Sequence, residues 1–81
     1  MTKLEQKLIE LGYIEQWNYD GVALYIKNSI DYETCIFINK QKITSTKINV
    51  KEPITQQYQL DNLQQAFNQL QNDLKELKEY E

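Results

Sequence analysis

An Asp-Gly pair at residues 20–21 separates two runs of aromatic and β-branched side chains. Such a pair adopts positive φ at both positions at little cost, which is what a type I′ hairpin turn requires. The pair therefore predicts two antiparallel strands, over residues 13–19 and 22–27. In that register Trp17 lies opposite Leu24.

The two faces of this hairpin differ in polarity, and the more apolar face is expected to meet the core. That face carries Trp17, Tyr19, Val22, Leu24 and Ile26. Tyr25 falls on the opposite face, which Cys35 and Phe37 are expected to share. If both helices cover the core face, this second face stays open, and its aromatic residues become candidates for contact with a partner.

Two more strands and a short helix are predicted on either side of the hairpin. Residues 32–39 form the run with the highest β propensity, and a turn at 40–41 leads to a fourth strand over 42–50. Leucines spaced at i, i+4 and i+7 predict an N-terminal helix that begins at Thr2 and ends at Gly12.

Residues 58–81 carry the clearest helical pattern, because their apolar residues alternate spacings of three and four. The stripe consists of Leu60, Leu63, Phe67, Leu70, Leu74 and Leu77. It is predicted to cover the sheet. The outer face is rich in amides at first and then acidic, through Asp73, Glu76, Glu79 and Glu81. The same spacing also fits a coiled-coil heptad, and in that alternative a second copy pairs through Leu74, Leu77 and Tyr80.

These elements predict a single α+β domain over residues 1–81, in the order α-β-β-β-β-α. A four-stranded antiparallel meander is covered by a short N-terminal helix and a long C-terminal helix. No apolar run approaches the about 20 residues that a membrane helix needs, and the N-terminus lacks the unbroken apolar stretch of a signal peptide. Together with the single cysteine, Cys35, this predicts a cytoplasmic protein without membrane contact.

The composition lacks several of the side chains that enzymes commonly use for catalysis. The chain contains no His and no Arg, and it has one Cys and two Gly. Without His, the commonest general base and metal ligand is missing, and the single thiol has no imidazole to activate it. Without Arg or a glycine-rich loop, no phosphate site is indicated. We therefore expect no enzyme, no catalytic residue, no cofactor and no metal.

Binding to another protein is the favoured interpretation, with self-assembly through the C-terminal helix as an alternative. The net charge of −3 makes a nucleic-acid partner unlikely on electrostatic grounds. Aromatic residues beside lysines on a sheet also stack on bases, so single-stranded nucleic acid is a second alternative. Apolar anchors for a protein partner are expected at Tyr25, Phe37 and Tyr58, and acidic or rim contacts at Glu76, Glu79 and Tyr80.

Two segments, "YDGVALYIKN" (19–28) and "LDNLQQAFNQLQNDLKEL" (60–77), resemble small accessory proteins of Gram-positive phages, prophages and mobile elements. The bias toward Lys, Ile, Asn, Tyr and Gln is similar to that of products of AT-rich genomes. The resemblance covers roughly half of the chain and is one of style, without a diagnostic motif. It implies a protein of the bacterial cytoplasm that binds and modulates a host protein, for example as an inhibitor of a defence nuclease.

Overall fold

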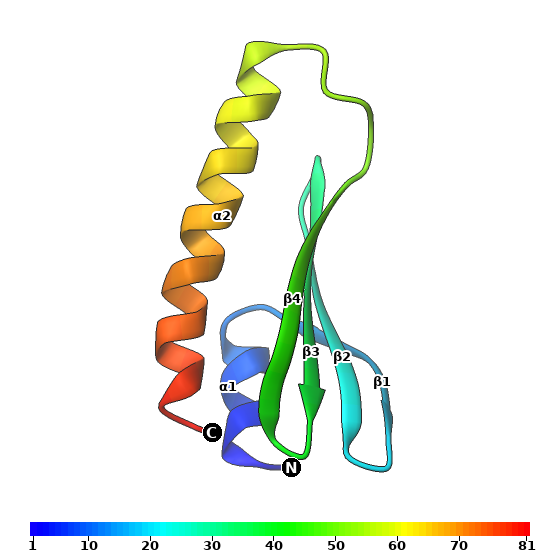
Figure 1. The fold of residues 1–81 in the computed structure, drawn as a ribbon, viewed down its shortest axis with the longest axis vertical. Helices are drawn as coiled ribbons and strands as arrows, with labels where there is room; N and C mark the ends of the chain where they lie inside the picture. The colour runs from blue at the N-terminus through cyan, green and yellow to red at the C-terminus, as the bar shows by residue number, and fades with distance from the viewer.

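The computed structural model describes residues 1–81 and confirms the predicted α+β order (Figure 1). The elements are α1 (Lys3–Glu10), β1 (Ile14–Tyr19), β2 (Val22–Asn28), β3 (Tyr32–Asn39), β4 (Lys42–Val50) and α2 (Gln57–Lys78). The strands form one antiparallel sheet in the order β1-β2-β3-β4. Both helices lie on the same face of this sheet (Figure 1). Neither helix is long and apolar enough to cross a membrane.

Local backbone signals set the ends of these elements. The Thr2 hydroxyl accepts a hydrogen bond from the Glu5 backbone N–H and so caps the start of α1. Gly12, at φ 99°, ends the helix in a left-handed conformation. The Asp20-Gly21 turn has positive φ at both positions, as a type I′ turn requires. The turn between β3 and β4 also has positive φ at both central residues, although neither is a glycine.

The core forms on the sheet face that was expected to stay open, so the predicted assignment of faces was wrong. Its fully packed members are Leu4, Leu8, Tyr13, Ala23, Tyr25, Ile36, Ile38, Leu70 and Leu77. β2 therefore turns Ala23 and Tyr25 toward the helices, and Leu24 away from them. The residues of the hairpin alone do not determine which face is covered. β3 contributes to that choice, because it places Ile36 beside Tyr25 and so adds branched residues to that face.

The two halves of α2 pack differently. In its C-terminal half Leu70 and Leu77 are buried and Leu74 packs against the core, with α1 alongside (Figure 1). In its N-terminal half Leu60 and Phe67 leave 47% and 44% of their surfaces exposed. The prediction that the apolar stripe covers the sheet is therefore confirmed for the C-terminal half and is only partly true of the N-terminal half.

A buried polar cluster ties α2 to the sheet. Asp73 is only 1% exposed, and its Oδ2 atom accepts hydrogen bonds from Tyr13 Oη at 2.9 Å and from Lys27 Nζ at 2.9 Å. Its Oδ1 atom accepts from Gln69 Nε2 at 3.0 Å. Burial, together with the hydrogen bond to Asp73, raises the pKa of Tyr13, so this hydroxyl stays protonated as a donor. The prediction that Asp73 belongs to a solvated acidic face was wrong.

Candidate binding face

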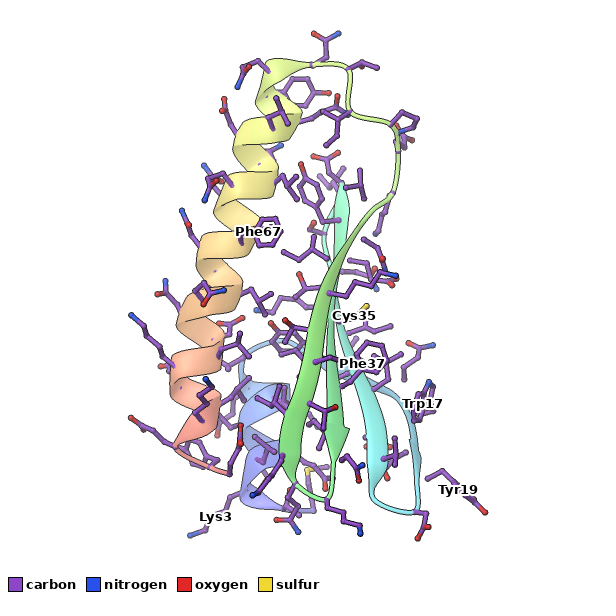
Figure 2. All side chains as sticks on the ribbon, viewed as in Figure 1. Lys3, Trp17, Tyr19, Cys35, Phe37 and Phe67 are labelled. Carbon is purple, nitrogen blue, oxygen red and sulfur yellow. The ribbon has the colours of Figure 1, made fainter.

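The side of the sheet that faces away from α1 and α2 is left uncovered, and we call it the open face. Its apolar side chains come from β1, β2 and β3 and are Ile14, Trp17, Tyr19, Val22, Leu24, Ile26, Cys35 and Phe37. Figure 2 shows Trp17, Tyr19, Cys35 and Phe37 on this side, away from the helices. Strand pairing places Trp17 beside Leu24 and Leu24 beside Phe37, so these three form a row across three neighbouring strands.

Several large apolar side chains of the open face are exposed to solvent. Trp17 exposes 44% of its surface, Ile14 67% and Tyr19 81%. Leu24 and Phe37 are half-buried by their neighbours on the sheet. Contiguous exposed apolar surface of this kind marks interaction sites, and aromatic residues are enriched in the centre of such sites.

The fourth strand gives the open face a basic border. The residues of β4 on this side are Lys42, Ser45, Lys47 and Asn49. A bulge at Thr44 produces this arrangement, because Ile43 pairs with Ile38 and Ser45 pairs with Phe37. In an unbroken ladder Lys47 would lie on the side covered by the helices. The extra residue therefore transfers this lysine to the open face.

Cys35 lies in the floor of the open face and is buried. Its Sγ atom donates a weak hydrogen bond to Glu33 Oε1 at 3.5 Å. Burial and then the neighbouring carboxylate raise the pKa of the thiol. The side chain therefore stays a neutral thiol and serves as a small apolar residue, since nucleophilic chemistry needs the thiolate.

The predicted anchors Phe37 and Tyr25 have different positions. Phe37 lies on the open face as expected. Tyr25 is fully buried on the covered face, and its hydroxyl donates a hydrogen bond to Glu15 Oε2 at 3.1 Å. The expectation that Tyr25 is an exposed anchor was wrong, because it lies one residue away from Leu24 and the sides alternate along a strand.

The other four predicted contact residues do not gather with Phe37. Tyr58 is exposed in the first turn of α2. Glu76, Glu79 and Tyr80 are exposed at the C-terminal end of that helix, where Lys7 Nζ lies 5.9 Å from the centre of the Tyr80 ring. Since α2 lies on the covered side of the sheet, none of the four borders the open face (Figure 1).

Two of the three residues predicted for self-association pack inside the chain. Leu77 is fully buried in the core, and Leu74 packs against that core. Of the three residues expected to pair with a second copy, only Tyr80 is exposed. The leucines of the last turns are thus occupied within the chain, which corrects the coiled-coil alternative for these residues.

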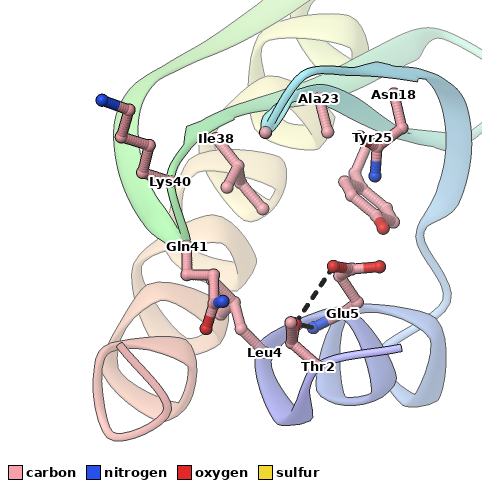
Figure 3. A pocket seen from close by; sticks show the side chains of 10 residues that line it. Thr2, Leu4, Glu5, Asn18, Ala23, Tyr25, Ile38, Lys40 and Gln41 are labelled. Atoms are coloured by element: carbon pink, nitrogen blue, oxygen red, sulfur yellow. Dashed lines mark hydrogen bonds between the residues drawn. The ribbon is translucent and has the colours of Figure 1, made fainter.

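Two hollows lie elsewhere on the molecule. One, of about 140 Å³, lies between the start of α1 and the hairpin ends (Figure 3). Two of its hydroxyl groups are already paired, since Thr2 Oγ1 donates to Glu5 Oε1 and the Tyr25 hydroxyl to Glu15. The other is a groove of about 530 Å³ between residues 29–32 and α2, to which α2 contributes the amides of Asn62, Gln65 and Gln69.

Comparison of the chain with protein-family models, with curated proteins and with solved structures gives no significant match. The function is therefore argued from the open face itself. The sequence predicted Phe37 as a contact residue but assigned Trp17 and Leu24 to the core. The bulge that brings Lys47 beside the aromatic row has no sequence signature in "KITSTKINV" (42–50).

Proposed function

We propose that this chain is a non-enzymatic protein that acts by binding another protein through the open face. One observation carries the proposal: the row of Trp17, Leu24 and Phe37 crosses three strands and is covered by neither helix. Trp and Phe side chains bury large areas while losing few rotamers, which makes them effective anchors at the centre of an interface. Exposure of such a row to water is unfavourable in the free protein, and burial of the row on docking is favourable.

The partner we propose is a host protein of the bacterial cytoplasm whose activity is modulated by binding. The resemblance to accessory proteins of phages and mobile elements supports this choice. Inhibition of a defence nuclease is one such role. A chain of 81 residues with one sizeable open face is suited to blocking a surface on a larger protein.

Affinity capture from a bacterial lysate tests the proposal. Tagged wild-type protein is compared with the double variant Trp17→Ser/Phe37→Ser and with Tyr58→Ser, which removes an exposed aromatic ring from the helical layer. We expect the wild type and Tyr58→Ser to retain the same partner and the double variant to lose it. Far-UV circular dichroism verifies that all three are folded. Capture of the same partner by the folded double variant would show that the open face is not the docking surface.

Single-stranded nucleic acid is a second candidate, because aromatic residues and lysines share the open face. The two lysines would neutralise about two phosphates, so log K would fall with log salt with a slope of only about −1.4. Titration of an oligothymidylate at several salt concentrations measures that slope. A steeper dependence with tight binding would favour nucleic acid over protein.

A further inference from the structure

We infer that the open face recognises an acidic segment of its partner, in which an apolar side chain is flanked by carboxylates. The inference rests on the proposed function, since it assumes that the open face is the docking surface. It adds the chemical class of the partner. Three features of the face carry it: its local charge, the spacing of its lysines, and its mismatch with a second copy of itself.

The local charge of the open face is opposite in sign to that of the whole chain. The four strands place Lys42 and Lys47 on this face and only one carboxylate, Glu33. Glu33 is already engaged, because its Oε1 atom accepts a hydrogen bond from Asn49 Nδ2 at 3.3 Å. The net charge of the chain is −3, so the acidic excess lies elsewhere on the molecule. A negatively charged partner is therefore drawn to this face in preference to the others.

The two lysines are placed on either side of the aromatic row. Lys42 lies opposite Asn39 and Lys47 opposite Cys35, and Phe37 lies between these two positions on β3. The two positions are four residues apart along β3, which corresponds to about 13 Å at the usual rise of a strand. An extended segment with two carboxylates about four residues apart would reach both ammonium groups while its central side chain covers Phe37.

A second copy of the open face does not meet this requirement. Each copy would bring two lysines and one engaged carboxylate, so two faces packed together would leave ammonium groups without counter-charges. Like charges opposed at an interface cost binding energy and act against the wrong partner. The charge pattern therefore favours a different, acidic partner over self-association through this face.

A nucleic-acid strand is also a poorer match than an acidic peptide. Such a strand carries one charge per nucleotide, whereas the face offers two lysines and no Arg. The aromatic rings also share the open face with aliphatic side chains, Ile14, Val22 and Leu24, that suit leucine-like groups. Peptide side chains fill such a surface by apolar contact, and few carboxylates are needed to satisfy the lysines.

Fluorescence anisotropy with three labelled probes tests the inference. The first is a short peptide with Leu and Trp anchors flanked by Glu, the second has Lys in place of every Glu, and the third is an oligothymidylate of matched length. We expect the acidic peptide to bind at least about tenfold more tightly than the basic one. The charge reversal Lys42→Glu/Lys47→Glu should invert that preference. The matched reversal Lys75→Glu/Lys78→Glu, on the exposed side of α2, should leave it unchanged.

The remaining outcomes overturn the inference. These are equal binding of the two peptides, preference for the basic peptide, binding of the oligothymidylate alone, and no binding of any probe. A dimer of the wild type that Trp17→Ser dissociates in sedimentation would also overturn it, because the face would then be occupied by a second copy. If Lys42→Glu/Lys47→Glu still captures the lysate partner and Trp17→Ser/Phe37→Ser does not, the inference fails while the proposed function stands.

Discussion

The two faces of the sheet are built from alternating residues of the same strands, yet they have opposite roles. Ile36 and Phe37 are neighbours in β3, and one is fully buried beneath the helices while the other lies on the open face. On the covered face every buried polar side-chain atom has a hydrogen-bond partner. On the open face large rings remain half in water. Strands that are apolar on both sides therefore do not reveal which side will be covered, and helices distant in sequence make that choice.

The largest difference between the faces should appear in stability. Ile36→Ala removes fully buried methyl groups and is expected to lower the free energy of unfolding by about 2–4 kcal/mol. Phe37→Ala removes a larger side chain from a partly exposed site, where no closed cavity is left, and should cost only about 1–2 kcal/mol. Urea titration followed by circular dichroism measures both. Equal losses would show that the two faces are equally packed, against the structure.

Within the covered face, Asp73 should matter more than any other carboxylate. Asp73→Ala leaves the Tyr13 hydroxyl and the Lys27 ammonium without their common acceptor, and we expect a loss of about 2–3 kcal/mol. Glu76→Ala is the matched control on the same helix, where the side chain is exposed and the change should stay within about 0.5 kcal/mol. Equal midpoints of urea unfolding for the two variants would contradict the role assigned to the buried cluster.

Much of this architecture could be predicted, because its signals are local. The Asp-Gly turn, the glycine after α1 and the leucine spacing of α2 each specify a short stretch of backbone. The assignment of faces was wrong because it depends on β3 and on bulges in β1 and β4, which are not visible in the pattern. Asp73 did carry a usable signal: it lies three residues after Leu70 and four before Leu77, within the apolar stripe and not outside it.

The covered face should also lose stability in alkali through the buried Tyr25. A tyrosine in the unfolded chain loses its proton at about pH 10. Burial, and then the Glu5 and Glu15 carboxylates, raise the pKa of Tyr25, so the folded protein keeps a proton that the unfolded chain releases. Its contribution to stability is therefore complete below that pH and is lost as the pH rises toward the raised pKa, by up to about 1.4 kcal/mol per pH unit.

Matched variants isolate this contribution. Tyr25→Phe should make the fall in the urea midpoint above pH 10 less steep than in the wild type. Tyr19→Phe removes the same hydroxyl from an exposed ring on the open face and is the matched control. If both variants gave the same slope, the buried hydroxyl would not be responsible for the alkaline loss of stability.

The smallest effect on stability is expected at Trp17, where the open face is proposed to meet its partner. Because part of its ring is exposed in the free protein, Trp17→Ser should change the free energy of unfolding by less than about 1 kcal/mol. Trp17 is the single tryptophan of the chain, so its emission reports on the open face alone. Acrylamide should quench that emission in the free protein, and a bound acidic peptide that carries only Leu anchors should protect the ring and shift its emission to shorter wavelength. Emission already protected in the free monomer would mean that this face is covered within the chain itself, and the surface on which the proposed docking depends would not be available.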